Sequence, residues 1–273
     1  MKILLISFCW IVFQFSSNAQ QMAAADRVKT IPGNFTYFKP DGLGNIFALT
    51  QKGQLKKYNA AFDSMGVFND VRRYGRLHSI SFGNALRTLL YFKEFRTVLI
   101  LDRFMQVVNK IDLRKSNIFQ ASLATLGYDN AIWIFDEQES RIKKLDEEGK
   151  LILETADLRI ILNEAIKPES LFDFGGNLYL YDPVKGLFIF DYYGGFNKRI
   201  SLLGWSFLQP MGKNIVGVKG DKLMVYVPNS IDIKESSLTL PMLTSRSLYF
   251  TPSGYLYLDD EGIQVFEWKN KIP

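Results

Sequence analysis

The stretch LYLYDPVKGLFIF, residues 178–190, decides the fold. It holds two four-residue runs, at 178–181 and 187–190, that are apolar at every position and are separated by a short turn. A strand with one face in water alternates apolar and polar side chains, whereas a strand covered on both faces is apolar throughout. Neighbouring blades cover both faces of the middle strands of a β-propeller blade, so the stretch indicates the central hairpin of a blade.

Hairpins of this kind recur along the whole chain. The first runs begin at residues 46, 89, 132, 178, 223 and 255, at intervals of 43, 43, 46, 45 and 32 residues. A second run follows each of them after 8 to 10 residues, at Leu55, Val98, Ile142, Leu187, Ile231 and Ile263. A period in the low forties that is built from strands alone is typical of propeller blades, and the six repeats predict six blades.

The other strands of each blade fit around these hairpins. Inner strands are predicted at 35–38, 79–82, 122–126, 171–174, 215–218 and 248–250, and outer strands at 66–68, 107–113, 151–154, 199–203 and 238–240. The strand-like residues 27–31 are expected to complete the sixth blade and so to close the ring, which removes a free sheet edge. The expected fold is therefore all-β, a six-bladed β-propeller whose N-terminal strand completes the last blade, with one short helix within 157–165.

The first nineteen residues resemble a secretory signal peptide and not a part of the fold. Lys2 precedes an apolar run from Ile3 to Phe15, and the small residues Ser17 and Ala19 suit cleavage after Ala19. A membrane anchor needs about 20 apolar residues, and this run has only about 13. We expect a signal peptide at 1–19, a single propeller domain at 20–273, and no transmembrane span in the mature chain.

The residue counts exclude several kinds of catalytic site. The 273 residues include one histidine, His78, and one cysteine, Cys9, which lies in the segment expected to be removed. A disulfide framework and a zinc site built on histidine or cysteine are thereby excluded. The sequence has no GxSxG motif and no glycine-rich loop that leads into a helix. It predicts no catalytic residues, no metal site and no cofactor.

A basic segment, Arg72-Arg73-Tyr74-Gly75-Arg76-Leu77-His78, lies in the connection between the first outer strand and the second inner strand. Cations also fall in the connections predicted for later blades, at Arg114, Lys115, Arg159, Lys167, Lys213 and Arg246. Such connections lie on one face of a propeller, so the pattern predicts a basic rim that binds an anionic partner. Charged loop residues that are simply solvated and bind no partner would give the same pattern. The small formal net charge of the chain, only +5, is compatible with this interpretation. The candidate partner-binding residues are Arg72, Arg73, Tyr74, Arg76 and His78.

A second candidate is the aromatic stretch 205–211, WSFLQPM, in the connection predicted before the fifth inner strand. Its large side chains, Trp205, Phe207 and Met211, are of the kinds that dominate protein–protein contacts when they are exposed. The same stretch could instead fold over the edge of a blade and be buried. Both interpretations remain open from the sequence.

The chain resembles a bacterial periplasmic six-bladed β-propeller of the NHL/TolB-like kind over residues 28–268. The run LYFKEF at 90–95, followed by VLILD at 98–102, is also similar to the second blade of an uncharacterised group of envelope propellers. The resemblance specifies architecture much more than activity, because such propellers include interaction scaffolds, ligand binders, lactonases and lyases. The WD dipeptide of the WD40 group is absent.

This resemblance implies a calcium site as one alternative, because lactonase-like propellers hold calcium in the central channel. The carboxylates and amides that could serve are Asp129, Asp173, Asp221, Asn84, Asn130 and Asn177. Asn and Asp are equally favoured in tight turns because they tolerate positive φ and bond their own backbone. We therefore interpret these residues as turn formers.

The leading hypothesis is a non-enzymatic periplasmic protein-interaction scaffold of the bacterial cell envelope. Its partner would be another envelope protein with an acidic or carboxylate-bearing surface, and in the narrower form the protein is an accessory subunit of an outer-membrane secretion channel. Nucleic acid is not expected as a partner of an exported protein with so mild a charge. The alternative is a small-ligand-binding or lactonase/lyase-like propeller that uses the central channel. Carboxylates and amides lining that channel would favour the alternative, and Phe, Tyr and Leu would disfavour it.

Overall fold

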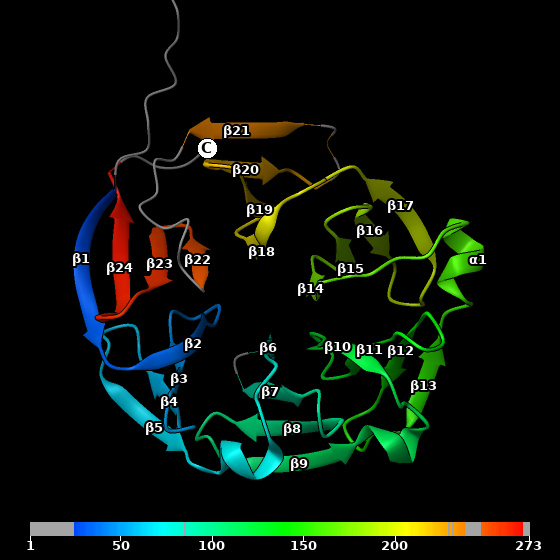
Figure 1. The fold of residues 1–273 in the computed structure, drawn as a ribbon, viewed down its shortest axis with the longest axis horizontal. Coiled ribbons are helices and arrows are strands. Elements are labelled where there is room, and N and C mark those ends of the chain that lie inside the picture. Colours follow the sequence, from blue (N-terminus) through cyan, green and yellow to red (C-terminus); the bar gives the residue numbers. More distant parts are fainter. Residues whose placement is uncertain (1–24, 85, 229, 231, 238–246, 270–273) are drawn as a thin grey trace, which may run out of the picture.

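Six four-stranded antiparallel sheets are arranged in a ring around a central axis (Figure 1). The structure, a computed structural model, describes residues 25–84, 86–228, 230, 232–237 and 247–269. Each sheet is one blade, with its first strand nearest the axis and its fourth at the rim. The predicted all-β, six-bladed propeller is confirmed. The expected signal peptide at 1–19 lies outside the described residues.

The strands of blades 1 to 3 follow the sequence in order. Blade 1 consists of β2 (Phe35–Pro40), β3 (Ile46–Thr50), β4 (Leu55–Tyr58) and β5 (Ser64–Phe68). Blade 2 consists of β6 (Ser79–Asn84), β7 (Arg87–Phe92), β8 (Thr97–Asp102) and β9 (Val107–Asp112). Blade 3 consists of β10 (Ala121–Leu126), β11 (Ile132–Asp136), β12 (Arg141–Leu145) and β13 (Leu151–Glu154).

Blades 4 to 6 complete the ring. Blade 4 consists of β14 (Ser170–Phe174), β15 (Asn177–Asp182), β16 (Gly186–Phe190) and β17 (Phe196–Ile200). Blade 5 consists of β18 (Ser206–Met211), β19 (Asn214–Lys219), β20 (Lys222–Tyr226) and β21 (Ile233–Ser237). Blade 6 consists of β22 (Leu248–Thr251), β23 (Gly254–Leu258), β24 (Gly262–Trp268) and β1 (Ala25–Pro32).

The N-terminal strand closes the ring, as the sequence predicts. β1 pairs with β24 in antiparallel register from Ala25 opposite Trp268 to Pro32 opposite Gly262, with one bulge. The seam is tight at Gly262, where φ is +134° and a Cβ atom would lie 2.1 Å from the carbonyl oxygen of Ile31. Only glycine fits this position without moving the backbone of β1.

Blade 5 corrects the strand assignment made from the sequence. Its inner strand is β18, within the stretch predicted as a connection, and residues 215–218 belong to the second strand, β19. The run at 223–226 is accordingly the third strand, and β21 is the outer strand. The outer strand predicted at 238–240 lies outside the described residues. With this shift the second strands begin at 46, 87, 132, 177, 214 and 254, which removes the 32-residue interval.

Apolar side chains from neighbouring blades form the core between them. One cluster joins Leu178, Phe188 and Phe190 of blade 4 to Trp133 and Phe135 of blade 3, all of them fully buried. The runs at 178–181 and 187–190 are buried at every position. Burial on both faces of these strands therefore explains their uninterrupted apolar pattern, as inferred from the sequence. At about 25 cal/mol per Å² of apolar surface, this repeated burial is the main stabilising contribution to the ring.

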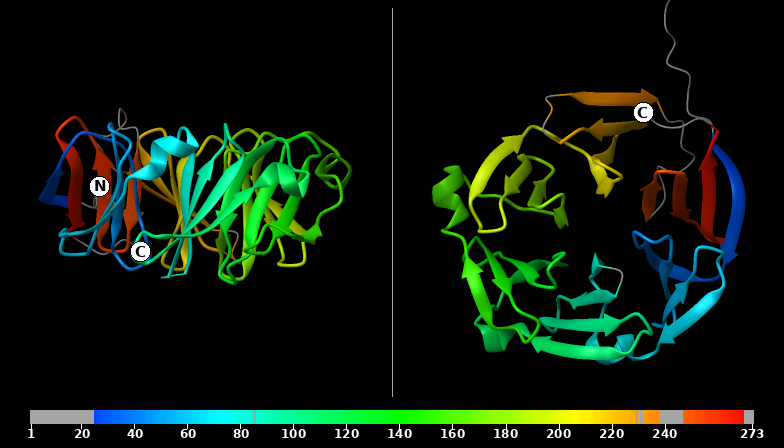
Figure 2. Two further views of the ribbon diagram at one scale, coloured as in Figure 1. Left: turned by 90° about the horizontal axis from the view of Figure 1, so that it is seen from below. Right: turned by 180° about the vertical axis from the view of Figure 1, so that it is seen from behind.

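Connections alternate between the two faces of the ring because each blade is an antiparallel meander. One face, termed here the connection face, carries the links between blades and the turns between second and third strands. The opposite face carries the two other turns of each blade. The short helices η1 (Asp70–Tyr74), η2 (Leu113–Ser116) and α1 (Leu158–Leu162) lie in links between blades, hence on the connection face. Figure 2 shows the ring edge-on, with strands running between the two faces.

The helix expected within 157–165 is confirmed as α1, with Asp157 as its N-cap accepting a hydrogen bond from the Arg159 amide. No helix in the described part of the chain is both long and apolar enough to cross a membrane.

Candidate functional site

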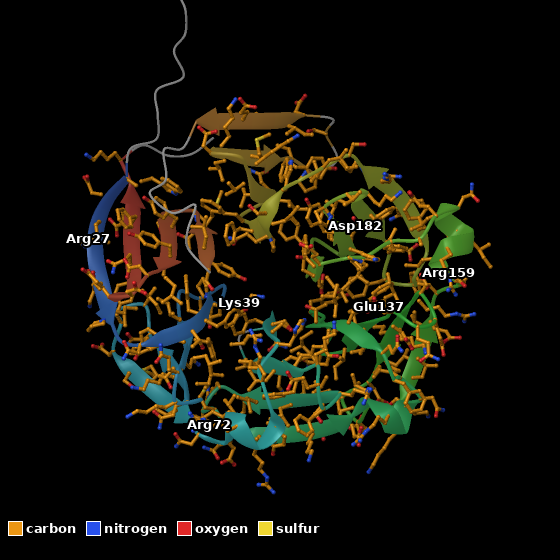
Figure 3. All side chains as sticks on the ribbon, in the orientation of Figure 1. Arg27, Lys39, Arg72, Glu137, Arg159 and Asp182 are labelled. Carbon is orange, nitrogen blue, oxygen red and sulfur yellow. The ribbon has the colours of Figure 1, made fainter. Side chains whose placement is uncertain are left out.

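The basic segment at 72–78 lies on the connection face, in η1 and the residues that follow it. Val71 and Leu77 are buried and hold the segment against blades 1 and 2, while Arg72, Arg73, Arg76 and His78 are exposed. The local sequence explains this arrangement, because two apolar anchors six residues apart leave the intervening charged side chains on the outer surface. Figure 3 shows Arg72 at the rim of the ring, far from the central axis.

Two members of the predicted site have structural contacts of their own. Arg72 donates a hydrogen bond of 3.3 Å from Nη2 to the carbonyl oxygen of Gln51 and packs its stem against Gly53. Tyr74 is half-buried, with its ring centroid 5.5 Å from that of Phe92. Tyr74 therefore supports the segment from beneath and offers a partner little surface.

Two exposed phenylalanines continue the basic segment across blade 2. Phe95 is 55% exposed and its ring covers Gly75, where a Cβ atom would lie 2.5 Å from the ring. Arg96 donates a hydrogen bond from Nε to the carbonyl oxygen of Phe119, which is 48% exposed. These contacts make one continuous surface, termed here the basic-aromatic patch: Arg72, Arg73, Arg76, Phe95, Arg96 and Phe119. Of these residues the sequence pointed to Arg72, Arg73 and Arg76, and it gave no sign of Arg96, Phe95 or Phe119.

The patch carries a net positive charge. The link at 69–78 and the turn at 93–96 hold five cations, Arg72, Arg73, Arg76, Lys93 and Arg96, against two carboxylates, Asp70 and Glu94. Among the described residues, no carboxylate lies within 4.0 Å of the guanidinium groups of Arg72, Arg73 or Arg76. Their charge is therefore available to a partner, and salt will screen it because it is exposed.

The expected basic rim around the connection face is present only in part. Lys115 and Lys167 are exposed in the links that follow blades 2 and 3, and no carboxylate among the described residues pairs with them. Arg114 pairs with Asp112 at 2.6 Å and Arg159 with Asp157 at 2.5 Å, so these two guanidinium groups are neutralised within their own links. Lys213 lies between β18 and β19 on the opposite face, because blade 5 begins earlier than predicted. Arg246 lies outside the described residues. The link at 69–78 and the turn at 93–96 hold the densest group of unpaired cations on this face of the described chain.

His78 contributes no charge to the patch near neutral pH. Although part of the side chain is exposed, partial desolvation by the surrounding protein lowers the pKa of His78 below its usual value of 6.5, and the nearby cations Lys93 and Arg76 lower it further. Its ring packs edge-on against Tyr91, with 5.6 Å between centroids. A neutral imidazole still offers a hydrogen bond, but the electrostatic attraction of this surface comes from its arginines and lysine.

Trp205 is not the exposed side chain that a partner-binding loop requires. It is 4% exposed and packs between blades 4 and 5 with Tyr179 and Leu202. Its backbone amide donates to the Tyr181 hydroxyl at 2.7 Å, and that hydroxyl donates to its carbonyl oxygen at 2.9 Å. Of the two interpretations left open by the sequence, the buried one is correct for this residue. Trp205 connects two blades.

Phe207 and Met211 lie on the inner strand of blade 5 and not in a loop. Both are partly buried against the core between blades 5 and 6. Pro210 lies beside them on the same strand, and the stretch therefore looked irregular in the sequence. The innermost strand is a sheet edge, and a proline is tolerated there because its missing N–H is not required for pairing on the side facing the channel.

Several aromatic side chains of the six inner strands are half-buried and pack against the cores between blades. Half-buried rings come from Tyr37, Phe82, Phe172, Phe174 and Tyr249. Asp173 is the one acidic residue within the six inner strands. No group of three or more His, Cys, Asp or Glu side chains in the described chain is arranged to hold a metal ion.

Most of the candidate calcium ligands are already bonded within the protein. Asp129 pairs with Lys144 at 2.7 Å, and Asp173 accepts bonds from the Tyr128 amide and the Tyr192 hydroxyl. Asn84 donates to the side chain of Asn130 at 2.6 Å. Burial raises the pKa of Asp173, and the bond from Tyr192 opposes that shift. Asp129 and Asn130 lie in the turn between β10 and β11, as their interpretation as turn formers expects. Asp173 lies within strand β14 and bonds to two other segments, so that interpretation is wrong for Asp173.

Lys39 is a channel residue that the sequence analysis did not single out. It lies on β2, and Figure 3 shows its side chain directed toward the central axis. It is the one basic residue within the six inner strands. Its Nζ atom donates to the carbonyl oxygen of Ile80 at 2.7 Å. Burial lowers the pKa of Lys39 from 10.5 to about 8.

This lysine predicts that the free energy of unfolding rises with pH between about 8 and 10. In that window the unfolded chain keeps a proton on the Lys39 amine that the folded chain has lost, so the folded state gains stability as pH rises. The gain is at most about 3 kcal/mol, from about 1.4 kcal/mol for each unit of pKa difference. Above pH 10 the trend reverses, because burial raises the pKa of Tyr37 to about 12 and an unfolded tyrosine loses its proton first.

Urea denaturation from pH 7 to pH 10 measures this effect. Lys39→Met is expected to be more stable than the unmodified protein at pH 7, with a difference that shrinks toward pH 10. Two stability curves that stay parallel across this range would show that Lys39 does not titrate differently in the folded and unfolded chains.

No protein-family model and no curated protein matches the sequence. Among solved structures, the chain is similar to the WD40 domain of Pan2 from Neurospora crassa, with 12% identity and a TM-score of 0.62, over 91% of this chain and 96% of that one. It is also similar to virginiamycin B lyase from Staphylococcus aureus, with 12% identity and a TM-score of 0.57, over 91% and 89%.

A third similar structure is PorZ, an essential bacterial surface component of the type-IX secretion system of Porphyromonas gingivalis. The identity is 16% and the TM-score 0.51, over 85% of this chain and 31% of PorZ. At these identities the three similarities establish a shared β-propeller fold, which in other proteins carries quite different functions.

Proposed function

We propose that the protein is a non-enzymatic scaffold of the bacterial cell envelope that binds another envelope protein through the basic-aromatic patch. The observation that carries this proposal is the unpaired charge of Arg72, Arg73 and Arg76 beside the exposed rings of Phe95 and Phe119. Interfaces are enriched in arginine and aromatic side chains, and exposed aromatic rings next to unpaired guanidinium groups suit an acidic surface with apolar residues at its centre.

The proposal includes the cellular location and the family. The segment at 1–19 acts as a signal peptide, residues 20–273 form the mature periplasmic domain, and the chain belongs with NHL/TolB-like envelope propellers. In its narrower form the protein is an accessory subunit of an outer-membrane secretion channel. The similarity to PorZ, a surface component of a secretion system, supports this form only through the shared fold.

A second candidate function is binding of a small ligand in the central channel. It is favoured by one observation, the direction of the Lys39 side chain toward the central axis beside the rings of Phe82 and Tyr249. The similarity to virginiamycin B lyase is compatible with it and adds only the fold. Because the inner strands hold a single carboxylate, we propose binding there without hydrolysis.

Charge reversal of the patch tests the scaffold proposal. The triple variant Arg72→Glu, Arg73→Glu, Arg76→Glu is expected to reduce the yield of cross-linked partner in intact cells at least tenfold. The reason is that three guanidinium groups would be replaced by carboxylates facing an acidic surface, and like charges at an interface are strongly unfavourable. Cross-linking followed by mass spectrometry identifies the partner and measures the yield.

A matched control changes the same amount of charge elsewhere. Lys150, Lys198 and Lys213 are exposed and lie on the opposite face or the outer strand of blade 4. Their replacement by glutamate should leave the cross-link intact. If both triple variants fold and lose the partner equally, net charge and not the patch governs the interaction. If the patch variant keeps the full yield, the proposed surface is wrong.

A further inference from the structure

The ammonium group of Lys39 lies between three blades at the central channel. Its Nζ atom is 6.0 Å from the ring centroid of Phe82 in blade 2 and 5.9 Å from that of Tyr249 in blade 6. Its hydrogen bond of 2.7 Å goes to the carbonyl oxygen of Ile80 in blade 2. The residue as a whole is half-buried, and Figure 3 shows its side chain directed toward the central axis.

The charge of Lys39 has no carboxylate partner. Within the described residues, no Asp or Glu oxygen lies within 4.0 Å of its Nζ atom. The one acidic residue of the inner strands, Asp173, lies in blade 4 and is engaged by the Tyr128 amide and the Tyr192 hydroxyl. An ammonium has three donors, and the carbonyl of Ile80 accepts one of them. A partly desolvated cation of this kind costs free energy unless an anion or water completes its shell.

The walls around this amine suit a flat apolar body. Phe82 and Tyr249 present half-buried rings beside it. Tyr37, also half-buried, forms a hydrogen bond with the backbone of Ile80, the residue whose carbonyl oxygen accepts from Lys39. Burial raises the pKa of Tyr37 to about 12 and that of Tyr249 well above 10, so both phenols keep their protons at neutral pH. A neutral phenol can donate a hydrogen bond, and neither phenol repels an anion. Aromatic rings also pack favourably against other rings in offset or edge-on arrangements.

From this arrangement we infer that the channel binds a small aromatic carboxylate, with its carboxylate on Lys39 and its ring between the aromatic side chains of blades 1, 2 and 6. The carboxylate supplies the missing counter-charge, and the ring replaces water against Tyr37, Phe82 and Tyr249. This site is distinct from the basic-aromatic patch, which lies at the rim of the ring (Figure 3).

Calorimetric titration with benzoate and with indole-3-acetate tests the inference. Benzamide, a neutral analogue of benzoate with the same shape, is the matched ligand control. At pH 7 the intact protein should bind benzoate at least tenfold more tightly than benzamide. Lys39→Met should weaken benzoate at least tenfold and leave benzamide unchanged, since methionine keeps most of the length of lysine without its charge. Lys198→Met, at an exposed position on β17, should change neither affinity.

Proton uptake gives a second measurement. A lysine with only a structural role would take up no proton when the ligand binds. A bound anion raises the pKa of a neighbouring amine, and burial places the pKa of free Lys39 at about 8. At pH 8, benzoate binding should therefore be accompanied by uptake of up to about half a proton per site, as measured by titration in buffers of different ionisation enthalpy. Lys39→Met should bind without proton uptake.

Each outcome bears directly on the inference. Folded protein that binds neither probe up to 10 mM would overturn it, and so would Lys39→Met protein that binds benzoate as tightly as the unmodified chain. Equal affinity for benzoate and benzamide would show that binding depends on the shape of the ligand and not on its charge, which would contradict the role given to Lys39. The result is independent of the cross-linking experiment, because Lys39 is far from Arg72 and the two sets of variants do not overlap (Figure 3).

Discussion

Deletion of residues 25–32 should abolish the single cooperative unfolding transition of the ring. Strand β1 pairs with β24 at seven positions and buries Ile31 in the core between blades 6 and 1. At about 1 kcal/mol for each backbone hydrogen bond, together with the burial of Ile31, the loss amounts to more than about 5 kcal/mol. This is comparable with the entire stability of a typical domain. Thermal unfolding followed by circular dichroism measures the change.

The deletion should also make the protein associate. Without β1, the strand β24 becomes a free edge whose N–H and C=O groups can pair with another chain. Size-exclusion chromatography should show dimers or aggregates. A matched control, Asp26→Thr with Val28→Thr, changes exposed side chains of β1 and leaves its backbone pairing in place, so it should behave like the unmodified protein. A monomeric deletion variant with an unchanged transition would show that ring closure by β1 contributes little to stability.

Replacement of Asp136 by alanine should be among the most destabilising single substitutions, at about 3–5 kcal/mol. The carboxylate of Asp136 lies 2.9 Å from Nζ of Lys143, and the two side chains are 2% and 5% exposed. Glu139 also contacts this amine at 2.7 Å from a half-exposed position. Removal of Asp136 leaves the lysine buried with one partner at the surface, and it removes the acceptor for the Gln138 amide in the turn. Urea denaturation at neutral pH measures the loss.

A double variant separates two effects of the substitution: the loss of the hydrogen bond from the Gln138 amide to Asp136, and the buried charge of Lys143 that is left without its partner. Asp136→Leu with Lys143→Met should recover much of the stability, because two apolar side chains of similar size tolerate burial better than one isolated charge. Lys222→Met is the control, since the pair of Lys222 with Glu235 is exposed and such pairs contribute little. A double variant that is as unstable as Asp136→Ala would point to the turn hydrogen bond, and not to the ion pair, as the source of the effect.

The strand pattern of five blades was predictable because the middle strands are apolar on both faces. The runs at 46, 89, 132, 178 and 255 fall within β3, β7, β11, β15 and β23 of the structure. Blade 5 was misassigned because its inner strand includes Ser206, Gln209 and Pro210 and lacks an uninterrupted apolar run. The interval of 32 residues before the last repeat was the available signal, and it disappears once β19 is taken as the second strand.

The candidate site was predictable where it depends on local sequence and not where it depends on ring closure. The exposure of Arg72, Arg73 and Arg76 follows from their position in one link. The neutralisation of Arg114 by Asp112, two residues away, could have been anticipated from the sequence. Lys39 could not be placed in this way, because a lysine in a strand usually faces solvent. Only the arrangement of six blades around one axis directs it into a shared channel.

The seam between β1 and β24 also determines the order in which the chain can fold. Ala25 and Trp268 are partners at this seam although nearly the whole chain separates them. During synthesis, β1 emerges first and has no strand to pair with until the last blade is complete, so its pairing carries the largest loop-closure entropy in the molecule. Each of the other blades pairs strands that are neighbours in the sequence and can form early. Among the described strands, the one that comes first in the sequence is therefore expected to be the last to pair.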